Sequence, residues 1–220
     1  MRHDKVIDQN PLPDGVGDRL RAQITFIAEA DRLKTIVRAS TLAAVDRREN
    51  DAEHSWHLAL MVLLLAEYAD EPIDIGHTMK LVIVHDLVEV YAGDSPVFDS
   101  GAMIDQRERE KAAADRLFTL LPNDQMGLMH SLWEEFENAE SPEARFAKSM
   151  DRLEPMLLNW LNRGGTWQMP DANEATVRAR EAGTVATSTS LGGLADLLVR
   201  QGLAHGWIRP DPTTSGNSAT

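Results

Sequence analysis

The region that decides the fold reads Leu81-Val82-Ile83-Val84-His85-Asp86-Leu87-Val88-Glu89. It is apolar except for one imidazole and two carboxylates, and burying such groups costs several kcal/mol unless each has a partner. Glu89 follows His85 by four residues and Asp86 by three, so on a helix the three side chains project from neighbouring positions. The pattern fits a buried ion-pair network and a functional site equally well, and other parts of the sequence must separate the two.

Helical periodicity continues on both sides of this region. A helix is expected over 75–91 with Gly93 as its stop signal. The helix before it is expected to begin with Asn50 and Glu53 as a capping box and to reach about Tyr68. Further helical patterns cover residues 16–45, 104–121, 124–137, 142–162 and 174–200. No run alternates in the manner of a strand, so the sequence predicts an all-α bundle of about seven helices.

A chain of 220 residues is long enough for one well-buried domain. Polar segments that contain proline lie at both ends, and we expect residues 1–14 to form a flexible lead-in and residues 206–220 a disordered tail. The domain is expected to occupy residues 15–205. Its motif-bearing core covers about 20–163, and a C-terminal helical extension covers about 174–205.

The composition excludes several classes of partner and site. Lys and Arg total 22 against 35 Asp and Glu, which gives a net charge of −13 and argues against binding a nucleic acid polymer or an anionic membrane surface. The absence of cysteine excludes disulfides, thiolate metal sites and cysteine nucleophiles. The longest apolar run, Leu58 to Ala66, is too short to span a bilayer, and no signal core follows Met1, so a cytoplasmic protein is expected.

Two residues outside the central region extend its polar set. His54 lies in the first turn of its expected helix, where the positive end of the helix dipole disfavours the imidazolium and keeps the ring able to bind a metal. Asp151 interrupts a helix that otherwise has the pattern of a core helix. His57 is a weaker candidate and is expected to be a core or partly exposed histidine. A mixed set of nitrogen and oxygen donors that suits Mn²⁺, Co²⁺, Fe²⁺, Zn²⁺ or Ni²⁺ is formed by His54, His85, Asp86 and Asp151.

Two acids remain beside these four residues. Glu89 and Asp94 are placed to act as general base and general acid, or to hold a second divalent ion. The two carboxylates of the four-residue set would balance the charge of one divalent ion.

Taken together, these motifs resemble the HD-domain metal-dependent phosphohydrolases, and more narrowly their 5′-deoxynucleotidase branch. The resemblance covers about residues 20–163 and implies one HD-domain helical bundle. It is carried by Asn50-Asp51-Ala52-Glu53-His54-Ser55, by His85-Asp86-Leu87-Val88-Glu89 with Gly93-Asp94, and by Leu132-Trp133-Glu134-Glu135-Phe136-Glu137 before Ala147-Lys148-Ser149-Met150-Asp151.

The resemblance also implies a role for each site residue. It makes His54, His85, Asp86 and Asp151 the metal ligands. Glu89 would orient or deprotonate the attacking water, and Asp94 would contact the sugar or leaving-group side of the substrate and help hold a second ion. Arg38 falls where this branch has a phosphate-binding arginine, against the alternative of a solvated charge on a helix. A homodimer is implied as well, with the C-terminal helix as one source of contacts.

The predicted function is hydrolysis of (deoxy)nucleoside 5′-monophosphates to nucleoside and phosphate by a divalent-metal-dependent phosphomonoesterase. One alternative is another HD-type phosphohydrolase, either a phosphodiesterase or a nucleoside triphosphate hydrolase, which would release tripolyphosphate in place of phosphate. A second is a non-catalytic metal- or nucleotide-binding module, against which Glu89 and Asp94 count because a structural site needs no extra acids. The third is a helical bundle that binds no metal.

Overall fold

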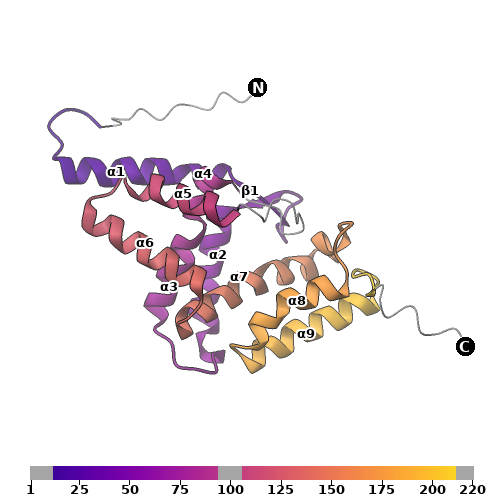
Figure 1. The fold of residues 1–220 in the computed structure, drawn as a ribbon. Coiled ribbons are helices and arrows are strands. Elements are labelled where there is room, and N and C mark those ends of the chain that lie inside the picture. The colour runs from indigo at the N-terminus through magenta and orange to yellow at the C-terminus, as the bar shows by residue number, and fades with distance from the viewer. Residues whose placement is uncertain (1–11, 94–105, 212–220) are drawn as a thin grey trace, which may run out of the picture.

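The computed structural model describes residues 12–93 and 106–211 (Figure 1). Within these residues the α-helices are α1 (Asp18–Ala30), α2 (Asp51–Leu65), α3 (Ile75–Val84), α4 (Glu89–Ala92), α5 (Gln106–Phe118), α6 (Asn123–Asn138), α7 (Pro142–Leu161), α8 (Glu174–Val185) and α9 (Thr189–Ala204). Short 3-10 helices span Asp31–Thr35, Ala66–Tyr68, His85–Val88 and Gly165–Gln168. The predicted all-α class is confirmed.

Three helices form the centre of the molecule, because α2, α3 and α7 all pack against one another. On one side of this centre lie α1, α4, α5 and α6, and the antiparallel pair α8 and α9 lies along α7 on another (Figure 1). Phe146 and Met150 of α7, Leu58 of α2, Leu81 of α3 and Phe118 of α5 are almost completely buried. Such burial contributes about 1.5–3 kcal/mol for each side chain.

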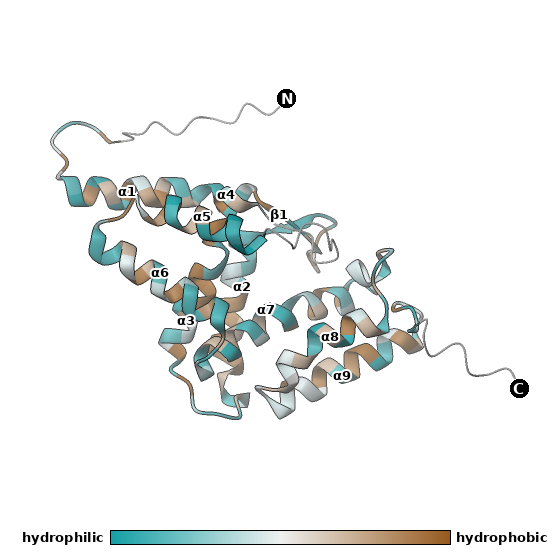
Figure 2. Cartoon of the chain, viewed as in Figure 1, coloured by the Kyte–Doolittle hydropathy of each residue, from teal (hydrophilic) through white to brown (hydrophobic). Residues whose placement is uncertain are grey.

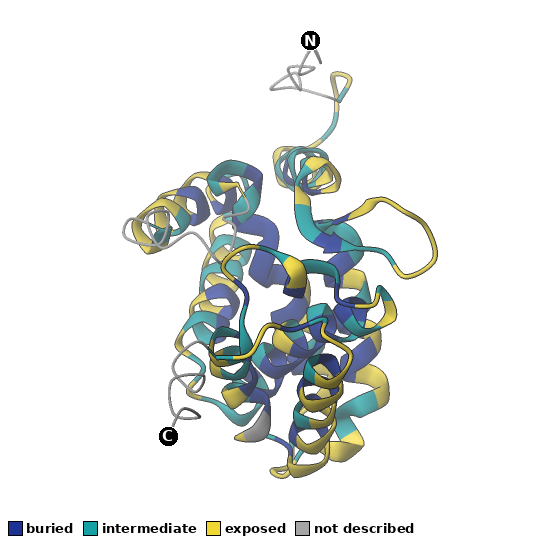
Figure 3. Ribbon diagram, turned by 90° about the vertical axis from the view of Figure 1, so that its right-hand side faces the viewer, coloured by how far each residue is buried: buried dark blue, intermediate teal, exposed yellow. Residues whose placement is uncertain are grey.

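The distribution of polar and apolar residues follows this arrangement. Apolar residues colour much of α2, α3 and α9 brown, whereas the first turns of α5 are hydrophilic (Figure 2). Buried positions gather where the helices face one another, and exposed positions lie on the outer faces (Figure 3). In the part of the chain that the structure describes, none of the helices combines the length and the hydrophobicity that crossing a membrane requires.

The expected ends of two helices are confirmed. The Asn50 side chain accepts a hydrogen bond from the Glu53 N–H at 3.0 Å, and the Glu53 carboxylate accepts one from the Asn50 N–H at 3.1 Å. This reciprocal pair is the predicted capping box, and it fixes where α2 begins. Gly93 follows α4 with φ of 75°, a left-handed backbone conformation that glycine adopts without a steric penalty.

The prediction of helical structure over residues 16–45, in one helix or two, is wrong in its second half. Helix α1 ends at Ala30, and the strands β1 (Val37–Thr41) and β2 (Arg48–Asn50) pair as a small antiparallel hairpin. The β-branched residues Thr35, Ile36 and Val37 come just where the chain becomes extended, and such residues favour strands over helices. The hairpin matters for function because it moves Arg38 from a helix to a strand.

Two other predicted helices are each divided. The helix expected over 75–91 tightens into a 3-10 turn at His85–Val88, and the pattern over 174–200 separates into α8 and α9, with Ser188 capping the second. These breaks raise the number of α-helices in the described residues from about seven to nine. The 3-10 turn carries the His85-Asp86 pair, so the interruption falls at the candidate site.

The predicted start of the disordered tail, residue 206, is too early. Ile208 is buried, and the Glu174 N–H donates a hydrogen bond to the Arg209 carbonyl at 2.8 Å. Arg209 in turn donates to the Ala172 carbonyl at 2.9 Å, so residues 206–211 close the start of α8. The remainder of the predicted tail, and most of the predicted lead-in, lie outside the described residues.

Candidate metal centre

The four predicted ligand residues come together from three helical segments. His54 lies on α2, His85 and Asp86 on the 3-10 turn after α3, and Asp151 on α7. His54 Nε2 is 3.0 Å from Asp151 Oδ1 and 4.0 Å from Asp86 Oδ2. His85 Nε2 is 3.0 Å from Asp86 Oδ1 and 3.8 Å from Asp151 Oδ1. Residues 97 positions apart in the sequence therefore point their donor atoms at one small volume.

The structure fixes which nitrogen of His85 faces this volume. Its Nδ1 lies 2.8 Å from the Val82 carbonyl, which can only accept a hydrogen bond, so Nδ1 carries the proton. In the neutral form of the ring, Nε2 then presents its lone pair toward Asp86 and Asp151, and this buried atom forms no hydrogen bond to any described residue. A metal-binding histidine needs such a lone pair, and its second ring nitrogen commonly donates to a backbone carbonyl, a carboxylate or water.

The donor set passes a chemical test for a divalent ion. Donor atoms of His54, His85 and Asp151 all lie within 4.8 Å of one another, and Asp86 adds a second carboxylate at the distances given above. Two neutral imidazoles and two carboxylates are borderline-to-hard donors of the kind that bind first-row divalent ions. This part of the predicted cofactor requirement, a cluster able to hold a metal ion, is confirmed.

The cluster is deep but open on one side. The His54 side chain is fully buried and that of His85 is 4% exposed, whereas that of Asp151 is 32% exposed. Asp151 is therefore the most solvent-exposed member of the cluster.

The mutual contacts shift the pKa values of these groups in the metal-free protein. Burial opposes protonation of His85, but the charges of Asp86 and Asp151 outweigh it and raise the pKa of His85 to about 9. Burial and Arg38 oppose protonation of His54 as well, yet the nearby carboxylates of Asp151, Glu154 and Glu49 raise the His54 pKa well above 6.5. The two imidazoles in turn hold the pKa of Asp151 well below 3.8, against the effect of burial. Without an ion, His54 and His85 are therefore protonated at neutral pH, and their positive charges face the carboxylates of the centre.

Arg38 is the only guanidinium that the described residues bring within 4 Å of two members of the cluster. Its Nη1 donates to Asp86 Oδ2 at 3.0 Å, and its Nη2 lies 3.9 Å from Asp151 Oδ1. Asp51 and Glu49 lie 3.5 and 3.8 Å from the same guanidinium. The side chain is only 14% exposed, so it is not a solvated charge, and it lies on β1 instead of a helix.

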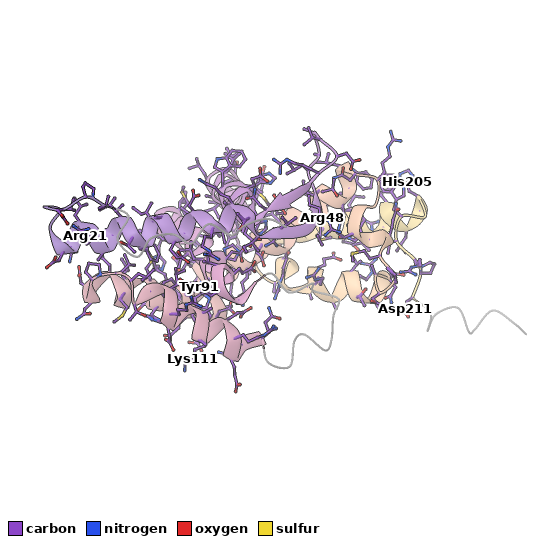
Figure 4. All side chains as sticks on the ribbon, turned by 90° about the horizontal axis from the view of Figure 1, so that it is seen from above. Arg21, Arg48, Tyr91, Lys111, His205 and Asp211 are labelled. Carbon is purple, nitrogen blue, oxygen red and sulfur yellow. The ribbon has the colours of Figure 1, made fainter. Side chains whose placement is uncertain are left out.

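The structure describes one of the two predicted catalytic acids. Glu89, the first residue of α4, is half-buried and near enough to Arg38 to raise the pKa of that guanidinium. Asp94 lies outside the described residues. Just before it, Tyr91 lies between α1 and α5 (Figure 4), where Arg116 covers its ring at 3.7 Å and Glu29 accepts its hydroxyl hydrogen bond. These contacts hold Tyr91 of α4 in place.

Sequence reasoning missed three groups beside the centre. Glu49 and Glu154 are buried next to His54, and Arg180 of α8 lies within electrostatic range of Asp151. The signal for Glu154 was present, because the helical face that contains the core residue Met150 and Asp151 also contains position 154. Glu49 stood in a charged stretch that resembled a loop, and no sequence pattern marked Arg180. His57 does not join the cluster and instead contacts Glu154 at 2.9 Å, as expected for a partly exposed histidine.

Comparison with known proteins places this site in a family. A family model described as HD domain matches residues 30–190, which include all four cluster residues. The chain belongs to the HD domain family. The chain is also similar to curated proteins that are named for an enzymatic activity. Among them is the 5'-deoxynucleotidase HDDC2 of Bos taurus, which is 30% identical over 149 residues, or 67% of this chain and 71% of that protein.

Solved structures support the same grouping. A predicted metal-dependent phosphohydrolase from Magnetospirillum magnetotacticum MS-1 is 46% identical, with a TM-score of 0.84 over 88% of this chain and 97% of that one. A conserved hypothetical protein from Pyrococcus furiosus is 26% identical, with a TM-score of 0.56 over 81% and 99% of the two chains. The HD domain fold therefore extends over nearly the whole length of these solved chains.

Proposed function

We propose that this protein is a metal-dependent phosphomonoesterase that hydrolyses (deoxy)nucleoside 5′-monophosphates to nucleoside and phosphate. The observation that carries the proposal is the joined cluster of His54, His85, Asp86 and Asp151 with the Arg38 guanidinium 3.0 Å from one of its carboxylates. The HDDC2 relatives, which are named 5'-deoxynucleotidases, support the choice of substrate.

In this proposal the four cluster residues hold one divalent ion, drawn from Mn²⁺, Co²⁺, Fe²⁺, Zn²⁺ or Ni²⁺. Such an ion supplies a water molecule of lowered pKa and polarises a phosphoryl oxygen. Because two carboxylates balance its charge, the site as a whole still needs a cation to attract a phosphate. Arg38 is that cation. Its planar fork matches two phosphate oxygens, and its place on the short strand β1 keeps it beside the cluster.

Glu89 and Asp94 are the proposed proton carriers. Glu89 accepts a proton from the water that attacks phosphorus, and the 5′ oxygen of the nucleoside leaves with a proton that Asp94 supplies. The position of Glu89 directly after the 3-10 turn supports its role, because that turn carries His85 and Asp86 and Glu89 lies near Arg38. Asp94 is also the proposed contact for the sugar, and with Glu89 it is the proposed ligand for a second divalent ion.

Two further features remain proposals. A homodimer is expected from the resemblance, with α9 as a source of contacts, and size-exclusion chromatography with light scattering tests it. The strongly acidic composition is also consistent with a small phosphorylated substrate in preference to a nucleic acid polymer.

The direct test measures phosphate release from a panel of nucleoside and deoxynucleoside 5′-monophosphates, with each metal supplied and again with a chelator present. We expect release that depends on metal and that falls when Glu89 is changed to Gln, while the metal content of that variant stays at the wild-type level. His54→Ala is expected to lose both metal and turnover. If folded, metal-loaded protein releases no phosphate from any substrate in the panel, the phosphatase proposal is wrong.

The same assay separates the alternatives. Release of tripolyphosphate from nucleoside triphosphates would indicate a triphosphate hydrolase, and cleavage of diesters a phosphodiesterase. Metal and nucleotide binding without turnover in the wild type would indicate a binding module.

A further inference from the structure

Two buried glutamates stand on the Nδ1 side of His54. Glu154 Oε2 lies 3.3 Å from His54 Nδ1, and Glu49 Oε2 lies 3.6 Å from the same atom. The side chains of all three residues are at most 2% exposed. Burying two carboxylates is expensive, and a fold keeps such a pair only where something compensates for it.

Each of these acids has a different second partner. Glu154 is held from behind by His57, whose Nδ1 is 2.9 Å from Glu154 Oε1. Glu49 lies between two buried donors, because its Oε2 is also 3.8 Å from Arg38 Nε. Arg38 Nε, Glu49 Oε2, His54 Nδ1 and Glu154 Oε2 are all buried without a hydrogen bond to any described residue. Donors and acceptors thus face one another at distances slightly longer than good hydrogen bonds.

The geometry has a chemical consequence for His54. Carboxylates accept hydrogen bonds, so two of them beside Nδ1 hold a proton on that nitrogen. Nε2, which faces Asp151 and Asp86, is then the nitrogen left to bind an ion. His85 achieves the same result with the Val82 carbonyl, whereas His54 lies in the first turn of α2 and uses acid side chains in its place.

We propose that Glu49 and Glu154 are positioning residues that orient His54 for metal binding, and that Glu49 also orients the Arg38 guanidinium toward the cluster. The inference rests on the proposed function, because it assumes that His54 binds the ion through Nε2. Within the centre, Glu154 orients His54, whereas Glu49 lies near both His54 and Arg38 and so links the metal side of the centre to the phosphate side.

The test compares Glu154→Ala and Glu154→Gln with a matched control, Glu181→Gln. Glu181 is also a buried glutamate, but its electrostatic partners are Arg178 and Asp196 on α8 and α9. Outer-shell changes of this kind typically weaken metal binding about 10- to 100-fold. We expect a Zn²⁺ affinity, measured by chelator competition, that falls about 10- to 100-fold in Glu154→Ala. Glu154→Gln, which keeps an acceptor oxygen, should recover part of that loss, and the control should match wild type.

A spectroscopic measurement reports the proton itself. In Zn²⁺-loaded protein labelled with ¹⁵N-histidine, the Nδ1–H resonance of His54 should exchange slowly with water, and the exchange should become faster in Glu154→Ala. For Glu49→Gln, we expect inorganic phosphate to bind more weakly to the metal-loaded protein, together with a weaker Zn²⁺ affinity.

Two results would overturn the proposal. One is a folded Glu154→Ala protein with wild-type Zn²⁺ affinity and an unchanged His54 resonance, since the glutamate would then serve only stability. The other is a second metal equivalent that disappears in both Glu49→Gln and Glu154→Gln, since these acids would then be ligands. Neither measurement uses turnover, so a protein that binds Zn²⁺ as expected but hydrolyses no nucleotide would refute the proposed function and leave this inference standing.

Discussion

Replacing Arg38 with leucine removes a buried cation that faces four carboxylates. The guanidinium lies 3.0 Å from Asp86, 3.5 Å from Asp51, 3.8 Å from Glu49 and 3.9 Å from Asp151. Leucine fills part of the volume but offers these acids no positive charge. The metal-free variant is therefore expected to have a much lower free energy of unfolding than the wild type.

The size of the penalty follows from burial. Removing one partner of a buried ion pair typically costs about 3–5 kcal/mol, because the remaining charge stays out of water. For a chain of this length about 1 kcal/mol corresponds to roughly 2–4 °C in Tm, so we expect a decrease of roughly 6–20 °C. A divalent ion replaces part of the lost positive charge. The decrease should therefore be smaller with metal than with chelator.

Thermal unfolding with chelator and with saturating metal measures both numbers. Arg178→Leu is the control, because Arg178 also faces several carboxylates, with Glu174 and Asp196 at 2.9 Å and Glu181 at 3.7 Å, but its side chain is 36% exposed against 14% for Arg38. Exposed pairs contribute at most about 1 kcal/mol, so this control should lose no more than roughly 4 °C. If Arg38→Leu and Arg178→Leu lower the Tm equally in chelator, Arg38 is not a buried counter-ion and the electrostatic account of the centre is wrong.

Three other changes test different parts of the structure. Asn50→Ala removes half of the capping box of α2 and should cost about 1 kcal/mol in urea unfolding; no measurable cost would show that the cap does not define the helix start. Because the folded pKa of His85 is about 9, against about 6.5 unfolded, the metal-free protein should lose up to ~3 kcal/mol as the pH rises from about 6.5 to about 9; a flat unfolding free energy over that range, in chelator, would contradict it. Arg180→Ala removes a cation near Asp151 and should raise KM by up to about tenfold, the equivalent of ~1.4 kcal/mol, and more than it lowers kcat; an unchanged KM would exclude Arg180 from substrate attraction.

Local signals in the sequence predicted the parts of the fold that local physics controls. Asn50 and Glu53 specified the start of α2 because a capping box needs only four consecutive residues. Gly93 marked the end of α4 because its backbone has positive φ. The hairpin was missed because its strands are short and their pairing depends on residues outside them, such as the Asp51 N–H that bonds to the Ile36 carbonyl at 3.2 Å.

Sequence patterns predicted only part of the site. His54, His85, Asp86 and Asp151 carried a signal because polar residues in apolar helices require partners. The buried acid Glu49 carried none, since a glutamate in a charged stretch looks like solvent-exposed surface until the hairpin turns it toward α2. Its burial results from tertiary packing, which no spacing rule along the chain contains.

The separation of 97 residues between His54 and Asp151 also concerns how the protein is made. During synthesis the segments that supply His54, His85 and Asp86 leave the ribosome well before the one that supplies Asp151, and Glu154 follows later still. A partly synthesised chain thus lacks one carboxylate of the centre and one acid that faces His54. Binding of an ion at the complete centre would therefore indicate that α7 has been synthesised and has packed against α2. A chain interrupted before residue 151 would have no complete centre and could not retain the ion.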